Sequence, residues 1–154
     1  MTDYPTDRKN CYVYARDYRD AGISVIPLRL DGSKKPAIAS WDPFTKRLAT
    51  DSELSNWFAS PRGIGLVTGI VSGGLEVLDF DDGSLFEPWR KQVERIVIWL
   101  PIVETPSGGY HVFYRCDEIG SSAKIAMDPE REKTTLIETR GENAYVAGDR
   151  KSVV

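Results

Sequence analysis

The sequence is poor in the residues from which disulfide frameworks and many zinc sites are built. Its 154 residues include two cysteines, Cys11 and Cys116, and a single histidine, too few for a disulfide scaffold or a four-cysteine metal site. No run approaches the roughly 18 consecutive apolar residues of a membrane span, and residues 1–10 are too polar for a signal-peptide core. We therefore expect a protein of a reducing, cytoplasmic compartment that has no membrane association.

The chain also lacks the basic surplus of proteins that hold duplex DNA through phosphate contacts alone. Its net charge is −3, from 20 basic and 23 acidic residues. The acidic excess lies after Arg62, where 10 basic residues face 15 acidic ones, against 10 and 8 before it. This balance favours a site that recruits a divalent cation first and a polyanion second.

A hydrophobic content of 41% is enough for one globular domain with a real core. Apolar spacing and capping signals predict helices over 6–21, from the capping box Thr50-Asp51-Ser52-Glu53 onward, and over 84–96. Apolar β-branched runs predict strands over 23–28, 64–68, 75–81, 110–115, 134–140 and 144–147. Residues 30–46 are expected to form a long loop, and residues 119–133 a loop or a short helix. This mixture indicates an α/β or α+β architecture.

The strand predicted over 75–81 ends in three carboxylates, Asp79, Asp81 and Asp82. Alternation along a strand places Asp79 and Asp81 on one face, about 6–7 Å apart, and turns Phe80 into the core. Two carboxylates at this spacing can share a pair of metal ions, which would relieve their mutual repulsion. The alternative is a strand that simply runs out into an acidic turn.

A second motif, Thr105-Pro106-Ser107-Gly108-Gly109-Tyr110-His111, combines a tight turn with a hydroxyl and the only histidine. Backbone N–H groups exposed at Gly108 and Gly109 could cradle a phosphate, with Ser107 and His111 beside it. The alternative is a hairpin turn followed by a histidine that serves the fold.

Two further segments carry charge in a suggestive pattern. Glu138 and Arg140 are expected on one face of a strand, as a metal ligand and a phosphate clamp, or else as a surface ion pair. In the long loop, Lys34, Lys35 and Trp41 could meet single-stranded nucleic acid through phosphate contacts and base stacking, or the lysines could be merely solvated.

Taken in order, these segments resemble the N-terminal prim-pol domain of bifunctional DNA primase/polymerases, in the archaeo-eukaryotic primase superfamily. The resemblance covers more than a hundred residues. Its pieces are Val25-Ile26-Pro27-Leu28, Lys35-Pro36, Trp41, Gly65-Leu66-Val67-Thr68-Gly69, Ser72-Gly73, Val77-Leu78-Asp79-Phe80-Asp81, Leu100-Pro101, Thr105 to Gly109 with His111, Glu138 and Arg140-Gly141.

The resemblance implies a modified RRM-like antiparallel or mixed sheet, joined to a second small α/β module with the active-site cleft between them. It implies that Asp79, Asp81 and Glu138 hold Mg²⁺ or Mn²⁺, and that Ser107, Gly108, Gly109, His111 and Arg140 bind the nucleotide.

The implied activity is that of a template-dependent nucleotidyltransferase, a DNA primase and DNA polymerase in replication. Its substrates would be dNTP or NTP and a single-stranded or primed DNA template. Such domains are commonly encoded on plasmids, phages or integrated elements, often fused to a helicase.

One departure keeps other interpretations open. After Tyr145-Val146-Ala147 the family pattern usually continues, whereas this chain reads Gly148-Asp149-Arg150-Lys151 and stops at Val154. We therefore expect one catalytic domain over 1–154, shortened at its C-terminal end. The early end and the net acidity favour an alternative, a non-catalytic nucleotide- or ssDNA-binding module derived from a replication protein. A third reading is a sugar-nucleotide transferase that uses the same Asp-x-Asp pair, against which the short chain and the turn motif count.

Overall fold

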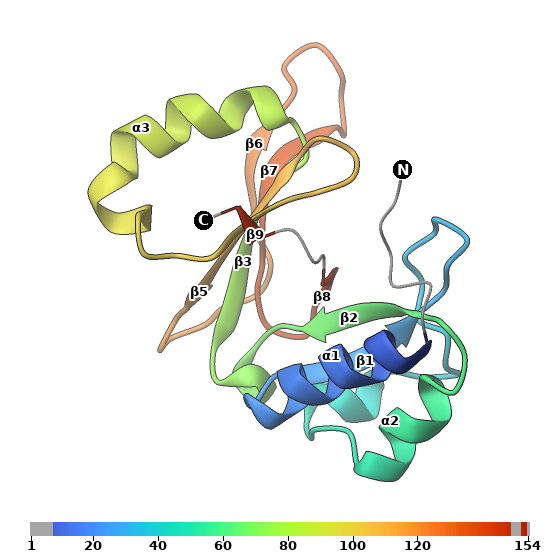
Figure 1. Cartoon of the computed structure of the whole chain (residues 1–154). Helices are drawn as coiled ribbons and strands as arrows, with labels where there is room; N and C mark the ends of the chain where they lie inside the picture. The colour runs from blue at the N-terminus through green and yellow to red at the C-terminus, as the bar shows by residue number, and fades with distance from the viewer. Residues whose placement is uncertain (1–7, 149–151, 154) are drawn as a thin grey trace.

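The computed structural model describes residues 8–148, 152 and 153, and these form an α+β fold with two antiparallel sheets (Figure 1). The helices are α1 (Arg8–Asp20), α2 (Asp51–Trp57) and α3 (Phe86–Val97). The strands are β1 (Ser24–Leu28), β2 (Gly63–Val67), β3 (Leu75–Phe80), β4 (Ile102–Glu104), β5 (Tyr110–Arg115), β6 (Lys124–Met127), β7 (Thr135–Arg140), β8 (Tyr145–Ala147) and β9 (Ser152–Val153). Short 3₁₀ helices cover Asp42–Thr45, Ile70–Ser72 and Gly83–Leu85.

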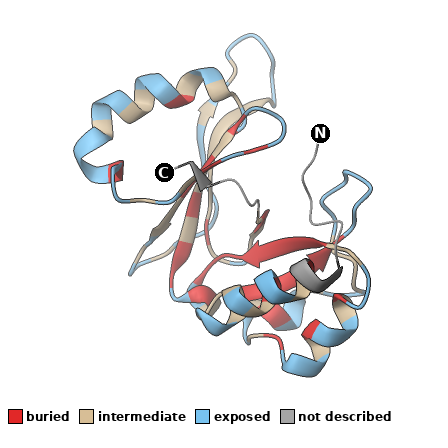
Figure 2. Cartoon of the chain, in the orientation of Figure 1, coloured by how far each residue is buried: buried red, intermediate tan, exposed pale blue. Residues whose placement is uncertain are grey.

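The first module consists of α1, α2 and a three-stranded sheet in the order β1-β2-β8. Strands β1 and β2 are buried along their whole length (Figure 2), as their near-continuous apolar sequences require. Helix α1 turns Cys11 and Ala15 into this core, and Tyr18 packs against it, so the apolar face predicted for this helix is confirmed. Gly22, with φ +85°, ends the helix in a Schellman motif, because the Ile23 N–H donates to the Tyr18 carbonyl.

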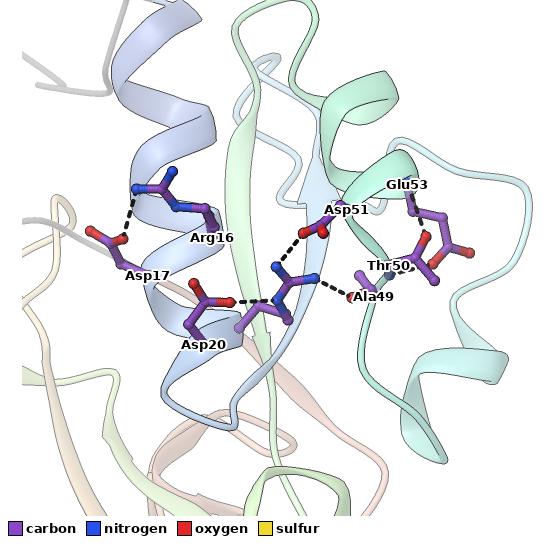
Figure 3. A network of polar contacts seen from close by, with 8 residues as sticks. Arg16, Asp17, Asp20, Ala49, Thr50, Asp51 and Glu53 are labelled. Carbon is purple, nitrogen blue, oxygen red and sulfur yellow. Dashed lines mark hydrogen bonds and ion pairs between the residues drawn. The ribbon is translucent and has the colours of Figure 1, made fainter.

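Helix α2 begins at the capping box that the sequence predicts. Glu53 donates its N–H to Thr50 Oγ1 at 3.2 Å, and its carboxylate accepts the Thr50 N–H at 2.8 Å (Figure 3). Arg19, in the last turn of α1, donates to the Asp51 carboxylate and to the Ala49 carbonyl. The start of α2 is thereby fixed to the end of α1.

The second module consists of α3 and a six-stranded sheet in the order β6-β7-β3-β5-β4-β9. Helix α3 covers one face of this sheet, where Phe86 stacks on Tyr110 with ring centroids 4.0 Å apart and Phe80 is fully buried. None of the helices in the described part of the chain is long and apolar enough to cross a membrane.

Polar contacts at the end of β2 join the two modules. The segment between β7 and β8 bonds there: Thr68 donates its hydroxyl to the Gly141 carbonyl at 2.5 Å and its N–H to the Ala144 carbonyl at 2.9 Å. Glu142 accepts the Ile70 N–H at 2.8 Å. The stretch that follows Arg140 is thus held against the first module.

The structure differs from the sequence predictions at three strands and in the long loop. Residues 124–127 form the irregular edge strand β6, where a loop or short helix was expected, and residues 102–104 and 152–153 form β4 and β9, which were not expected. The long loop folds back on β1 through a bridge between Leu28 and Pro36 and contains a 3₁₀ helix. Short edge strands depend on their partner strand more than on their own apolar pattern, which explains why they escape a reading of local sequence.

Candidate active site

Three neighbouring strands place two acidic residues and the histidine in one row, called here the acidic row. Asp79 on the central strand β3 lies directly opposite His111 on β5 and directly opposite Glu138 on β7. Residues opposite each other in antiparallel strands project from the same face. Asp79 and His111 are 7% and 5% exposed, so the middle of this row is withdrawn from water.

The row lies on the face of the sheet opposite to α3. Phe80 packs under α3 with Leu78 beside it, whereas Val77, on the alternate face, belongs to the core of the first module. Asp79 shares the face of Val77 by alternation. The acidic row is therefore turned toward the first module.

Asp79 is the most heavily contacted of the acids. Its Oδ1 lies 3.3 Å from His111 Nε2, and its Oδ2 lies 3.5 Å from Arg140 Nη2. Burial works to raise the pKa of Asp79, but the hydrogen bond from His111 and the charges of His111 and Arg140 outweigh it, and the pKa lies below the usual range. Asp79 is thus held as a carboxylate.

Glu138 and Arg140 project together, as alternation along β7 predicts. Arg140 Nη2 lies 2.5 Å from Glu138 Oε1, so one guanidinium nitrogen contacts both Glu138 and Asp79. Two buried nitrogens in this cluster, Arg140 Nε and His111 Nδ1, have no hydrogen-bond partner among the described residues. The polar network is therefore incomplete as it stands.

Asp81 lies just beyond the end of β3, and its N–H donates to the Leu136 carbonyl at 2.9 Å. Burial and the negative charge of Asp79 raise its pKa, against the opposing charges of Arg140, Lys34 and His111. Asp82, in contrast, is used by the fold, because its carboxylate caps the next 3₁₀ helix by accepting from the Ser84 N–H at 2.9 Å and the Ser84 hydroxyl at 2.6 Å.

The Ser107-Gly108-Gly109 turn lies against the acidic end of β3. A Cβ at Gly109 would come within 2.2 Å of the Phe80 carbonyl oxygen, and one at Gly83 within 2.0 Å of the Gly108 carbonyl oxygen. Only glycine permits this approach. The turn and Asp81 consequently belong to the same corner of the sheet.

The N–H groups of this turn are used inside it. Gly108 donates to the Thr105 carbonyl at 2.9 Å, and Gly109 donates to Thr105 Oγ1 at 3.0 Å. The expectation of free N–H groups for a phosphate is therefore not met in this arrangement. The Ser107 side chain contacts Thr105 Oγ1 at 3.2 Å, and Ser107 itself is exposed.

The long loop over residues 30–46, called here the lysine loop because it carries Lys34 and Lys35, approaches the acids from the first module. Lys34 and Lys35 are exposed, and Lys34 is close enough to Asp81 to act on its charge. Trp41 is half-buried and packs edge-on against Tyr145, with ring centroids 5.1 Å apart. Its indole therefore serves the first module's core, and its stacking on a base remains a prediction.

Two residues that shape the site, Tyr145 and Thr105, were not among the predicted site residues, although Thr105 begins the predicted turn motif. Tyr145 donates its hydroxyl to the Lys34 carbonyl at 3.1 Å and so holds the lysine loop. Buried Thr105 organises the turn through its hydroxyl. A threonine before Pro-Ser-Gly-Gly is a recognisable turn signal, whereas nothing local to Tyr145 points to Lys34.

Whether this site could bind a metal ion depends on which side chains offer ligand atoms and on what those atoms contact now. The carboxylates available as ligands are Asp79 and Glu138 in this row and Asp81 just beyond the end of β3. In the described part of the chain, no group of three His, Cys, Asp or Glu side chains is arranged to hold a metal ion as it stands. Arg140 instead contacts both Asp79 and Glu138.

Comparison with known proteins gives one family. The model of the bifunctional DNA primase/polymerase N-terminal domain, Prim-Pol, matches residues 15–151, a range that contains the whole acidic row, the turn and the lysine loop. A search of curated proteins gives no match. The family match covers most of the sequence, and the chain belongs to the Prim-Pol family of bifunctional DNA primase/polymerase N-terminal domains.

Proposed function

We propose that this chain is a template-dependent nucleotidyltransferase, a DNA primase and DNA polymerase, whose active centre is formed by Asp79, Asp81 and Glu138. Membership of the Prim-Pol family implies primase/polymerase activity at the level of the family. The observation that carries the proposal for these residues is the register that puts Glu138 directly beside Asp79, although the two are far apart in the sequence.

The donor set fits a hard divalent cation. Mg²⁺ and Mn²⁺ prefer carboxylate oxygen, and three carboxylates of this chain lie around one end of β3. Partial burial and the charge of Asp79 raise the pKa of Asp81, and a cation bound there would offset both effects. Held by Asp79, Asp81 and Glu138, such cations would supply the Lewis acidity that activates a 3′-hydroxyl and neutralises a departing pyrophosphate.

The remaining side chains would act on the substrate's phosphates. Ser107 presents an exposed hydroxyl next to the acidic end of β3, and the half-exposed Arg140 carries a guanidinium suited to a phosphate fork. His111 now bonds Asp79 through Nε2, so it orients that carboxylate and would contact a triphosphate only on releasing it. Lys34 and Lys35 would meet the template strand's phosphates.

The substrates on this proposal are a nucleoside triphosphate and a single-stranded or primed DNA template, bound where the two modules face each other. A replicative helicase, as a fused domain or a separate protein, is the partner that such an activity would serve. The occurrence of such domains on mobile genetic elements is part of the same proposal.

The proposal is tested by primer extension on a labelled primed template with dNTPs and either Mg²⁺ or Mn²⁺. We expect D79N, D81N and E138Q each to reduce incorporation about 100-fold or more, because each removes charge that the transition state requires. The matched control is D82N, which loses the same charge next to the same strand while Asn keeps the cap on Ser84. D82N should extend primers like the wild type.

Three outcomes would contradict the proposal. Unchanged incorporation by D79N and D81N would remove these residues from the mechanism. Binding of dNTP or single-stranded DNA by the wild type without incorporation, even in excess Mn²⁺, would identify a non-catalytic module of a replication protein. Hydrolysis of a sugar nucleotide without primer extension would indicate a sugar-nucleotide transferase.

A further inference from the structure

We infer that Arg140 is the built-in counter-cation of the Asp79–Glu138 pair, and that its guanidinium leaves these carboxylates when a divalent cation binds there. The inference deepens the proposed function and rests on it for the nature of the incoming ion. It concerns competition at the site: a side chain of the protein contacts the two carboxylates first, and the incoming divalent cation displaces it.

The need for a counter-cation follows from the register of the sheet. Asp79 and Glu138 lie directly opposite each other on β3 and β7, and their side chains are only 10% and 17% exposed. Two carboxylates that face each other across a strand pair repel, and more strongly when they are withdrawn from water. In this structure Arg140 Nη2 meets both of them, at 2.5 Å from Glu138 Oε1 and 3.5 Å from Asp79 Oδ2.

The guanidinium of Arg140 does not use all of its N–H groups in its ion pairs. A guanidinium normally binds a carboxylate with two parallel N–H groups, and Arg47 does so in this same chain, with Nη1 and Nη2 at 2.8 and 2.7 Å from the two oxygens of Glu53. Arg140 instead offers Nη2 alone to both acids, while its Nε is buried and has no partner among the described residues. A buried N–H without an acceptor costs free energy that any rearrangement giving it one would recover.

The Arg140 side chain is also exposed enough to move away from the two carboxylates. Its side chain is 36% exposed, more than either carboxylate, so the guanidinium can turn toward solvent without a change in the backbone of β7. On the proposed function, a divalent cation would be held by the same two carboxylates, Asp79 and Glu138, that Nη2 contacts now. The two cations therefore compete, and the apparent affinity for the metal is reduced by the fraction of molecules in which Arg140 holds the acids.

This competition predicts opposite effects of one substitution on two ligands. In R140Q the acids lose their internal cation, so the metal alone binds more tightly. The released guanidinium is also the group best placed to take a phosphate fork, so the same variant binds a triphosphate more weakly. A purely structural role of Arg140 would weaken both, because both sites would be disordered together.

The experiment is a titration with Mn²⁺ alone, followed by the paramagnetic signal of free Mn²⁺, in the wild type, R140Q, R140K and R90Q. We expect the Kd for Mn²⁺ to fall about tenfold in R140Q and to be unchanged in R90Q. That control removes the same charge from the exposed Arg90–Glu87 pair on α3. R140K, which keeps a charge but no fork, should lie between wild type and R140Q. dATP binding in Mg²⁺ should weaken in R140Q.

A second measurement needs no substitution. In the wild type, the Arg140 Nε–H resonance is followed by NMR during a Mg²⁺ titration, and displacement predicts a saturable shift of this resonance that the Arg90 resonance does not share. Equal or weaker Mn²⁺ binding by R140Q, or an Arg140 resonance unmoved at saturating Mg²⁺, would overturn the inference while leaving the proposed function in place. Absence of cation binding in every variant would overturn the metal-dependent function and the inference with it.

Discussion

Asp79 lies directly across from Glu138 in the antiparallel pair of β3 and β7, and a single nitrogen of Arg140 touches both carboxylates. The contact brings together residues from two predicted strands. The local sequence predicts which face of its strand each residue occupies, but not that these two strands are neighbours. Asp81 lies one step past the end of β3, and no cation among the described residues donates a hydrogen bond to it. The two aspartates therefore contribute differently to stability.

The first prediction concerns this difference. In a chelator at pH 7, D79N should lower the free energy of unfolding by about 1–3 kcal/mol, because a hydrogen-bonded carboxylate is lost from His111 and Arg140. D81N should raise it by roughly a few tenths of a kcal/mol at most, because a carboxylate whose pKa is raised costs stability when ionised, and Asp81 is exposed enough for solvent to screen most of that cost. Thermal melts of the two variants measure both effects.

The pH dependence checks the sign for Asp81. A raised pKa means that the folded protein takes up the proton more readily than the unfolded chain. The gain from D81N should therefore be complete at neutral pH and disappear as the pH falls below the ordinary aspartate pKa of about 3.9. A loss of stability in D81N at pH 7 would contradict the raised pKa of Asp81.

A second prediction concerns the close approach of the turn to β3. G109A would place a methyl group 2.2 Å from the Phe80 carbonyl oxygen, and we expect a loss of about 2–3 kcal/mol or more in urea denaturation. G108A meets no atom within 4 Å but has φ +85°, which predicts a loss of about 1 kcal/mol. The control is G120A, where a methyl group also meets nothing within 4 Å. Equal losses in all three variants would contradict the close packing.

A third prediction concerns the lysine loop. K34A/K35A removes two cations from the loop, and we expect the slope of log K against log salt for single-stranded DNA to fall in magnitude by about 1.4 if both contact phosphates. The control K91A/R95A removes two exposed charges from α3, on the far side of the second sheet. An unchanged slope in K34A/K35A would leave these lysines merely solvated.

A fourth prediction concerns the start of α2. The hydrogen bonds from Arg47 lower the pKa of Glu53 to about 2, against burial and with help from Thr50. A lowered pKa means that the stabilisation is full above the unfolded value of about 4.3 and is lost as the pH falls toward 2. E53Q should be less stable than wild type by about 0.5–1 kcal/mol at pH 7.

The stability of wild type and E53Q as a function of pH tests the same contribution of the Glu53 charge. The gap between wild type and E53Q should shrink steadily from pH 5 to pH 2 in denaturant melts. E118Q, which removes an exposed carboxylate elsewhere, should show no comparable narrowing. A gap that is constant with pH would mean that the carboxylate charge of Glu53 contributes nothing.

The sequence predicts most of the regular elements because their signals are local. The capping box at Thr50, the stop at Gly22 and the apolar run into Asp79 each depend on neighbours within a few residues, and each is confirmed. Strand β6 escapes because Ile125 and Met127 lie at an exposed edge, where no burial pattern marks the strand.

In the candidate site, too, local features could be predicted from the sequence and the features that depend on strand order could not. Alternation correctly predicts that Glu138 and Arg140 share a face. It contains no information on strand order, which is what puts Glu138 and His111 on either side of Asp79. The family resemblance, and not periodicity, grouped these three residues. The hydrogen bond that uses the Gly109 N–H depends on the Thr105 rotamer, which no spacing rule encodes, whereas the Gly108 N–H donates to the Thr105 backbone carbonyl.

Both strands that flank β3 follow it in the chain, and β7 follows β5. During synthesis on the ribosome, Asp79 emerges well before the segment that carries Glu138, so the acids can converge only after residue 140 has left the exit tunnel. A nascent chain halted before that point holds neither the charge pair nor its guanidinium. Translation of β7, the last long strand described, is therefore the step that completes the proposed centre.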